Sequence, residues 1–432
     1  MVRAAIEHLA TLVPGAAVAG AVLLGGGEKL AGTLDVGVPV VEGPTPVEAL
    51  IAGLTRFEPD LVYDLSDEPV VDARLRLRLA AQALLAGVAY QGADFRLDPP
   101  PRPHVATKPT IAVIGTGKRT GKTAVSAHLA RTLEVPPVIV AMGRGGPPEP
   151  EVIDPATFDL SVAGLVALAE QGRHAASDHL EDALTAGVVT IGTRRCGGGL
   201  AGAPVDSTFA AGVELANARP ESLIVLEGSG SAVPPVHADV TVCIVPATAD
   251  PELIGGYLGA YRLLLADLIV VTMAEHGAGP VVQTIRGLAP DAKIVETVLR
   301  PTPLHSVAGR RVFYVTTAPA AAGPTLVDHL ETTHGATVTG TSHNLARRPQ
   351  LAQDLERIGG ADVVLVELKA AGVDVVARAA LQQGRDVVFC DNRVVTNGGD
   401  GTFEGLVQRA ADLAEKRFRN GYRGAVMKGI QR

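Results

Sequence analysis

The chain has 432 residues, of which 47% are hydrophobic, 19% charged and 3% aromatic, with a formal net charge of −8 and three cysteines. No apolar run reaches the ~18 residues that span a bilayer, no Lys/Arg run forms a nucleic-acid face, and three scattered cysteines predict neither a disulfide framework nor a zinc site. We therefore expect a cytoplasmic α/β protein of two or three domains, without membrane or nucleic-acid partners.

The first hundred residues predict a small α/β domain. Stretches 17–24 and 61–71 are typical of strands, and 70–90 of a helix with apolar residues three and four apart. The proline-rich segment 96–109 predicts a linker, and a weaker boundary signal falls at 298–311. The predicted domains are an N-terminal α/β domain (1–100), a P-loop nucleotide-binding domain (108–298) and a C-terminal α/β domain (299–432).

After the linker, short apolar runs alternate with helical or loop segments. This alternation predicts a parallel sheet covered on both faces in the central domain, flanked by the two smaller α/β domains. The predicted central strands are 110–114, 137–141, 223–227, 240–245 and 267–272. The same pattern returns in the last part, at 311–317, 362–368 and 386–392.

The first central strand runs into the loop GTGKRTGKT, which a helix follows. Gly121, Lys122 and Thr123 match the end of a Walker A loop, in which backbone N–H groups hold phosphate, the lysine reaches the β/γ-phosphates and the hydroxyl binds Mg²⁺. The usual first glycine is replaced by Thr116, as in P-loops of the dethiobiotin synthetase type. The predicted ATP-binding residues are Gly115, Thr116, Gly117, Lys118, Arg119, Thr120, Gly121, Lys122 and Thr123.

Two later strand ends offer further nucleotide-site residues. Glu227 ends an apolar run before a glycine-rich turn and is predicted, with Thr123, to hold Mg²⁺. A strand-end glutamate that faces solvent is the plainer alternative. Thr272 and Glu275 follow the strand at 267–272, where they are candidates for contacts with adenine, although ordinary loop residues are the alternative.

Two segments that we interpret as loops combine arginine with glycine. Arg144 and Gly145 lie in 140–153, and 190–202 pairs Arg194 and Arg195 with a run of three glycines that includes Gly198. A guanidinium fork suits phosphate, and glycines let backbone N–H groups approach it. We predict substrate-binding anion sites here, with simple solvation of the arginines as the alternative.

Two basic residues follow strands of the last part. Lys369 and Arg393 lie at carboxyl ends, where α/β sheets bind ligands, and we count both as candidate substrate contacts. Structural salt bridging is the plainer interpretation of both.

Together the segments IAVIGTGKRTGKTAVSAHLAR, VAMGRGGPPEPEVI, LIVLEGSGSAVPP, LIVVTMAEH and VELKAAGVDV resemble the cyclic 2,3-diphosphoglycerate synthetase family. The resemblance covers most of the chain after the linker. It implies that ATP and Mg²⁺ drive closure of 2,3-diphosphoglycerate into a cyclic pyrophosphate, with release of ADP and phosphate. The implied catalytic residues are Lys118, Lys122, Arg144, Arg194 and Glu227.

The resemblance also carries expectations about assembly and the chain's start. A homodimer is expected, partly from the family and partly because symmetric dimers are the commonest assembly. The chain opens with a helical pattern where the family is expected to open with a strand, so either the start lies late or this element is absent.

Two alternatives stay open. Another ligase of the dethiobiotin synthetase type would use the same Lys122, Thr123 and Glu227 but only one anion pocket, which two arginine–glycine segments disfavour. A nucleotide-driven switch of the partitioning type usually has a second lysine at the position of Gly117. That lysine is missing here.

Overall fold

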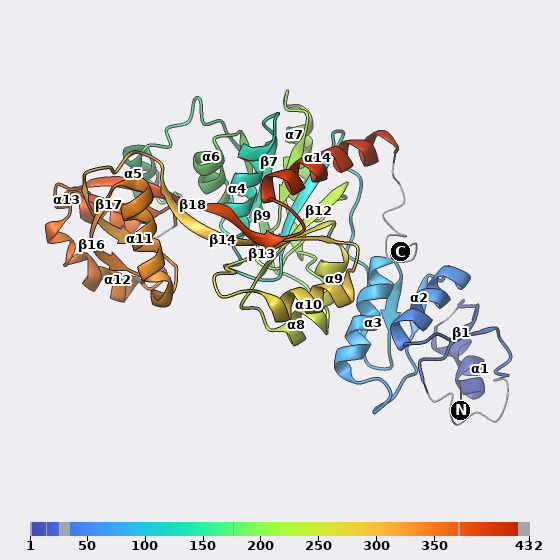
Figure 1. Ribbon diagram of the computed structural model, residues 1–432. Helices are drawn as coiled ribbons and strands as arrows, with labels where there is room; N and C mark the ends of the chain where they lie inside the picture. The colour runs from blue at the N-terminus through green and yellow to red at the C-terminus, as the bar shows by residue number, and fades with distance from the viewer. Residues whose placement is uncertain (1, 14, 26–34, 176, 370–371, 422–432) are drawn as a thin grey trace.

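The structure is a computed structural model that describes residues 2–13, 15–25, 35–175, 177–369 and 372–421. One large, mostly parallel sheet runs through the central and C-terminal parts of the chain, and two small sheets lie in the N-terminal part (Figure 1). Within these described ranges, no helix combines the length and the apolar character that crossing a bilayer requires. The predicted α/β class is confirmed.

The N-terminal part forms short strands and three helices. Its helices begin where the sequence provides caps: Thr45 accepts a hydrogen bond from the backbone N–H of Glu48, and Asp72 accepts one from that of Leu75. The elements are α1 (Val2–Leu12), β1 (Ala21–Val22), β2 (Val40–Val41), α2 (Pro46–Phe57), β3 (Leu61–Tyr63), α3 (Ala73–Leu85), β4 (Ala89–Gln91) and β5 (Arg96–Leu97).

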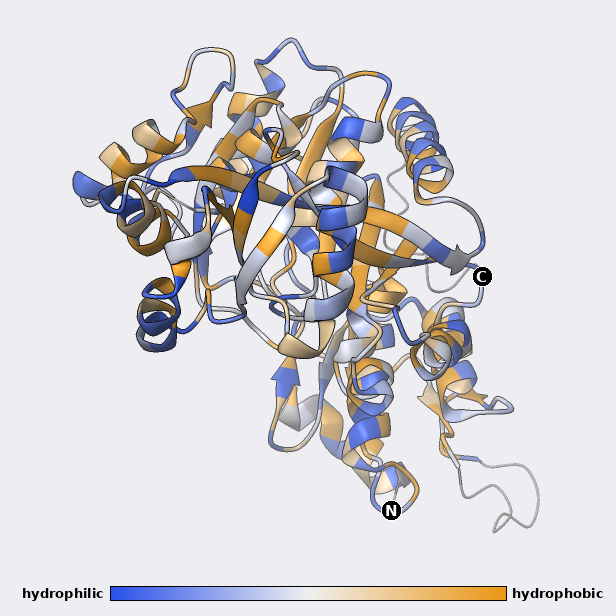
Figure 2. Ribbon diagram, turned by 60° about the vertical axis from the view of Figure 1, so that its left-hand side comes forward, coloured by the Kyte–Doolittle hydropathy of each residue, from blue (hydrophilic) through white to orange (hydrophobic). Residues whose placement is uncertain are grey.

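The central part holds most of the large sheet. The inner strands β6, β7, β11 and β13 are fully buried, mostly apolar runs because helices cover both faces, and this sheet is apolar in Figure 2. The elements are β6 (Thr110–Gly115), α4 (Lys122–Thr132), β7 (Val138–Gly143), β8 (Glu151–Ile153), α5 (Val162–Glu170), α6 (Asp178–Ala186), β9 (Thr190–Cys196), β10 (Asp206–Ser207), α7 (Phe209–Asn217), β11 (Ile224–Glu227), β12 (Val240–Pro246), α8 (Pro251–Gly255), α9 (Gly259–Leu264), β13 (Leu268–Thr272), α10 (Gly279–Leu288) and β14 (Lys293–Pro303).

The C-terminal part continues the same sheet. Its elements are β15 (Arg311–Val315), η2 (Ala320–Ala322), α11 (Gly323–His334), β16 (Thr337–Ser342), α12 (Arg348–Leu355), η3 (Ile358–Gly360), β17 (Val363–Glu367), η4 (Gly372–Ala377), α13 (Arg378–Gln382), β18 (Asp386–Gly399) and α14 (Phe403–Arg419). The strand order is β10-β9-β7-β11-β6-β12-β13-β14-β18-β17-β15-β16, with β8 paired to β9.

Alternate residues of β6 serve two cores. Ile111 and Val113 pack with apolar residues of α4 and α14, whereas Ala112 and Ile114 belong to the core that includes α3, α7, α9 and α10. This two-sided burial follows from the period of two along a strand. The helix α14 returns from the C-terminal part to cover the central sheet, in contact with β6 and α4.

The strand β14 does not end where the sequence suggested a boundary. Its residues 298–303 lie inside the strand and pair antiparallel with β18, so the weaker boundary signal at 298–311 marks a strand shared by both parts. Pro301 and Pro303 lie within this strand, where the central and C-terminal parts of the sheet join. The predicted domain limits themselves stay a prediction.

The antiparallel β14–β18 pair makes two carboxyl edges face each other. The first residues of β14 pair with β13, and the rest of the strand continues past the carboxyl end of β13. Likewise β18 pairs with β17 and then continues past the carboxyl end of β17 toward the central strands. The carboxyl ends of both parallel strand sets therefore point toward the space between the two parts, which is where α/β sheets bind ligands.

Candidate functional site

The P-loop connects β6 to α4 at the centre of the sheet. Gly121 precedes the helix with φ of 90°, a left-handed conformation that favours glycine, and no side chain caps the helix N-terminus. The unpaired N–H groups of the first helical turn are therefore available for an anion. Lys122 donates from Nζ to the carbonyl of Gly117 at 3.0 Å, which folds its side chain back over the loop.

The departure from the usual Walker pattern has a simple geometry. Gly115 is the glycine that the fold requires, because a Cβ there would lie 2.8 Å from Thr120 Oγ1 and 3.0 Å from Lys122 Cδ. Thr116 needs no glycine conformation, and its N–H donates to the carbonyl of Ile244 on β12 at 3.1 Å. The required glycine has thus moved one residue toward the strand.

Thr272 and Glu275 lie at the carboxyl end of β13, and both have protein partners. Thr272 is fully buried and its hydroxyl donates to the carbonyl of Thr120 at 2.7 Å, so it holds the P-loop from below. Glu275 forms an ion pair with Arg300 of β14 at 3.0 Å. Thr272 therefore supports the P-loop in this structure. Its side chain has no exposed atom with which to make the predicted contact with adenine.

A cluster of acids lies beside the P-loop lysine. Glu227, at the end of β11, is 2% exposed, and Asp182 of α6 is fully buried next to it. Asp178 and Glu181, from the first turn of the same helix, add their charges to the cluster. The negative potential of Glu227 and Asp178 acts on Lys122, whose pKa is lowered by burial and raised in part by these two acids.

Burial controls the protonation of the two innermost acids. It raises the pKa of both Asp182 and Glu227, and the nearby charge of Glu227 raises that of Asp182 further. Both oxygens of Asp182 and Oε2 of Glu227 lack any hydrogen-bond partner in the part of the chain that the structure describes. Burial and the nearby charge of Glu227 thus favour the protonated, uncharged form of Asp182.

Lys369 joins the C-terminal part to this cluster. It forms an ion pair with Glu181 across the space between the two carboxyl edges, at 2.6 Å to Oε2. Burial raises the pKa of Glu181 to about 7, and Lys369 opposes that shift. Burial lowers the pKa of Lys369, but the Glu181 charge more than offsets it and the net shift is upward. This ammonium is therefore compensated by a carboxylate.

Arg144 and Arg195, one from each of the two predicted arginine–glycine segments, line the same cavity. A cavity of about 380 Å³ is lined by Arg144, Arg195, Gly197, Gly198, Ser231 and Ala232. Lys118 of the P-loop reaches the same place: its Cγ and Nη2 of Arg195 both lie 3.5 Å from the position that a Cβ on Gly230 would take. The cavity therefore brings the P-loop, the β7 loop and the β9 loop together.

The arginines of the β9 segment need a correction. We interpreted 190–202 as a loop, but its first seven residues form β9, so neighbouring side chains point to opposite faces. Arg195 turns inward, is 5% exposed, and donates to the carbonyls of Gly197 and, at 2.9 Å, Ser229. Arg194 is exposed and donates to the carbonyl of Gly146 at 2.7 Å. It does not line the cavity.

Two other predicted residues lie apart from the cavity lining. Gly145 lies beside His174: atoms of the His174 ring are 3.7 Å from the position that a Cβ on Gly145 would take. Arg393 is exposed on β18, and its charge acts on His128 of α4, where it helps to lower the pKa that burial already lowers. Neither residue lines the cavity beside Lys118 and Arg195.

Thr123 and Glu227 form a donor set that suits Mg²⁺ at a nucleotide. A P-loop metal takes one hydroxyl, one carboxylate and otherwise phosphate oxygens and water, so few protein ligands are needed. The unpartnered Oε2 of Glu227 is an available hard oxygen donor. No group of three His, Cys, Asp or Glu side chains suited to a metal occurs among the described residues.

The α6 acids escaped the sequence analysis although a signal was present. Glu181 and Asp182 lie three and four residues after Asp178, so both are neighbours of Asp178 on the helix surface. Ser177, the residue before this helix, is a typical N-cap type. Acids on one face of a short amphipathic helix could have marked an inward-facing cluster.

Family models match nearly the whole chain. Residues 110–298 match the P-loop domain of cyclic 2,3-diphosphoglycerate synthetase, 303–393 match its C-terminal domain, and 1–98 match its N-terminal domain.

Curated relatives with this name match over similar lengths. The protein from Rubrobacter xylanophilus is 46% identical over 413 residues, covering 94% of this chain and 92% of the relative. The protein from Thermococcus gammatolerans is 46% identical over 409 residues, covering 92% of each. That from Methanothermus fervidus is 40% identical over 420 residues, covering 92% of this chain and 91% of the relative.

Proposed function

Because the chain belongs to the cyclic 2,3-diphosphoglycerate synthetase family, we propose that it uses ATP to close 2,3-diphosphoglycerate into its cyclic pyrophosphate. The chain is an enzyme of a synthetase family with a P-loop domain. The family relation does not favour a ligase of the dethiobiotin synthetase type or a nucleotide-driven switch.

The reaction balances as two displacements at phosphorus. An oxygen of one substrate phosphate attacks the γ-phosphorus of ATP, which forms a P–O–P bond and releases ADP. An oxygen of the second substrate phosphate then attacks the first substrate phosphorus, which closes the ring and releases inorganic phosphate. Each attacking oxygen is already an anion near neutral pH, so no general base is needed.

The main barrier is electrostatic, because three phosphate groups must approach one another. The observation that carries the proposal is the cavity beside the P-loop, where the cations of Arg144 and Arg195 meet Lys118. The described residues place no carboxylate within ion-pair distance of Arg144 or Arg195, so both charges are available to an anionic substrate. We assign substrate binding to these two arginines, and Arg194 a supporting role through Gly146.

We assign the nucleotide to the P-loop. The N–H groups of residues 117–122 and the ammonium of Lys122 hold its phosphates, and Lys118 faces the reacting groups from the same loop. Thr123 and Glu227 would hold Mg²⁺, which when bound neutralises phosphate charge. Asp182, buried next to Glu227, raises the negative potential at this site when it is ionised.

Phosphorus NMR of the protein with ATP, Mg²⁺ and 2,3-diphosphoglycerate tests the proposal. Two coupled pyrophosphate-type resonances from one molecule, appearing together with ADP and free phosphate, are expected. Formation of ADP and phosphate without those resonances would refute cyclisation and leave an ATPase with another acceptor. An Arg195→Gln control should lose the coupled resonances while nucleotide binding persists.

We also propose a cytoplasmic homodimer. ATP and the phosphorylated substrate are cytoplasmic metabolites, and a symmetric dimer is the commonest assembly of such enzymes. Light scattering after size-exclusion chromatography should give twice the mass of the 44.4 kDa chain. A monomer mass at assay concentration would refute the dimer.

A further inference from the structure

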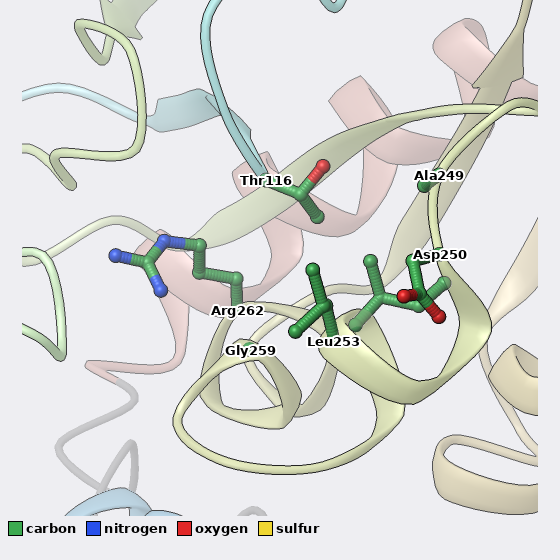
Figure 3. A pocket seen from close by; sticks show the side chains of 7 residues that line it. Thr116, Ala249, Asp250, Leu253, Gly259 and Arg262 are labelled. Carbon is green, nitrogen blue, oxygen red and sulfur yellow. The ribbon is translucent and has the colours of Figure 1, made fainter.

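A second buried arginine lies behind the substrate cavity. Arg262 of α9 is 5% exposed, and sequence analysis gave it no role. Its stem lines a neighbouring cavity of about 240 Å³ together with Thr116 and Leu253. Figure 3 shows its guanidinium pointing away from Leu253 and Asp250. The charged group therefore does not face these residues of the small cavity.

The guanidinium of Arg262 bonds three carbonyls from three segments. Its Nε donates to Ser231 at 2.8 Å, and its terminal nitrogens donate to Leu200 and Leu258 at 3.3 Å. Ser231 belongs to the turn after β11 and lines the substrate cavity. Leu200 belongs to the glycine-rich loop after β9. One side chain therefore fixes both loops that form the cavity wall.

Arg195 holds the same two loops from the opposite side. It bonds Gly197 in the first loop and Ser229 in the second. Among the residues that the structure describes, neither Arg195 nor Arg262 has a carboxylate within ion-pair distance. Burying a guanidinium with carbonyl partners alone is costly, and burial lowers the pKa of both arginines. An anion in the cavity would offset that cost.

We infer that Arg262 is a positioning residue for the anionic substrate: together with Arg195 it clamps the 197–202 and 229–232 loops and so fixes the cavity in which Arg144 and Arg195 receive the second phosphate group. The inference rests on the proposed cyclisation. Arg262 acts through the loops, because its guanidinium is buried behind them and the cavity is lined by Ser231 and not by Arg262.

Two substitutions at Arg262 test the inference with steady-state kinetics. Arg262→Gln removes the charge, and Arg262→Lys keeps a charge but cannot bond three carbonyls with one planar fork. Both variants should raise the KM for 2,3-diphosphoglycerate about tenfold. The KM for ATP should change less than about twofold, because the P-loop and Lys122 are not held by Arg262. Equal changes in both constants, or no change in a folded variant, would overturn the inference.

Gly202→Ala tests the contact between Arg262 and Ser231 without removing the arginine. Gly202 has φ of 89°, and a Cβ there would lie 2.9 Å from the carbonyl oxygen of Ser231 and 3.0 Å from Nη2 of Arg262. The alanine should therefore displace the clamp and give the same selective rise in the substrate KM. This variant decides the question if the Arg262 variants do not fold.

Arg417→Gln is the matched control. Arg417 is a half-buried arginine of α14 that bonds the carbonyl of Asp239 and, at 2.9 Å, the carboxylate of Asp267. These two acids directly precede β12 and β13, at the amino ends of the strands. Arg417→Gln should lower the free energy of unfolding, but it should not raise the KM for 2,3-diphosphoglycerate relative to the KM for ATP. Failure of the wild-type protein to make cyclic product would instead refute the proposed function, whereas normal cyclisation with unseparated KM values would refute only the role of Arg262.

Discussion

At the carboxyl edge of the C-terminal strands, the buried Glu367 accepts hydrogen bonds from Thr316, Thr317 and Asn392 at 2.5 to 3.2 Å. At the facing edge of the central strands, Arg144 and Arg195 have no carboxylate within ion-pair distance among the described residues. Both edges are places where α/β sheets bind ligands. Among the described residues, neither edge pairs these groups with an opposite charge, but the central edge presents cations, whereas the C-terminal edge holds a carboxylate bonded by neutral donors.

The difference teaches how to separate a structural charge from a ligand-binding one. Glu367 has enough protein partners to be stable in the folded chain by itself, and Asp354 in the same part is likewise bonded by Ser342 and Asn344. Arg195 donates only to carbonyls, which satisfy hydrogen bonding but not charge, and Arg144 is exposed at the cavity. A phosphorylated ligand would supply the missing negative charge there.

The largest expected effect comes from the P-loop itself. Lys122→Ala removes the ammonium that reaches the nucleotide phosphates and should lower kcat/KM at least about 1,000-fold, or ~4 kcal/mol. Coupled measurement of ADP and cyclic product should show both reactions lost together. ATP turnover that survives while cyclisation stops would contradict a shared role of Lys122 in both.

The next effect compares two neighbouring residues on opposite faces of β9. Arg195→Gln should lower kcat/KM for 2,3-diphosphoglycerate about 100-fold, or ~2.7 kcal/mol, because it removes a buried cation from the cavity. Arg194→Gln should change it less than about fivefold, since Arg194 is exposed and contacts Gly146 instead. Initial rates over a substrate titration measure both, with the KM for ATP as the internal control. A larger effect at Arg194 would reverse the assignment of faces.

That comparison also shows where the sequence was sufficient. The P-loop could be predicted because its strand, loop and helix are consecutive, and each residue's conformation depends on near neighbours. The strand character of β9 was missed because Gly192 and the two arginines interrupt its apolar run, which weakens the signal. Once a strand is recognised, the opposite directions of Arg194 and Arg195 follow from its period.

Other features could not follow from local sequence. Lys369 and Glu181 are separated by 188 positions, and their segments meet through the antiparallel β14–β18 pair and through the packing of α5 against η4. The return of α14 to the central sheet depends on the same pair. The role of Arg262 depends on two distant carbonyls, which no spacing of residue types reveals.

A smaller effect, on stability alone, is expected at the C-terminal edge. Glu367→Gln replaces one carboxylate oxygen with an NH₂ group, which cannot accept from the donors that surround it. The folded state should lose about 2 kcal/mol, the usual cost of leaving buried polar groups unpaired. Urea unfolding measures this loss, and Glu356→Gln, at an exposed residue of the same part, is the control. The KM for 2,3-diphosphoglycerate should stay within about twofold of wild type. A rise comparable with that of Arg195→Gln would mean that this edge binds substrate too.

The smallest effect concerns Glu151, whose charge is compensated by neighbouring basic residues. Lowering the pH should change the free energy of unfolding through this residue but should not change substrate binding. Glu151 of β8 lies 3.5 Å from His179 and also pairs with Arg173. The nearby His179, and then Arg173, lower the pKa of Glu151 from 4.5 to about 2, against the opposing effect of burial.

A carboxylate with a lowered pKa stabilises the folded state above its unfolded value and loses that contribution as the pH falls through the folded value. Wild type should therefore exceed Glu151→Gln in unfolding free energy above pH 4.5 by less than about 1 kcal/mol, because the pair is partly exposed. Urea titrations at several pH values should show this difference shrinking toward pH 2. Glu170→Gln, at an exposed residue of α5, should show no such trend. A difference that is independent of pH would mean that packing of the side chain, and not its charge, stabilises this rim.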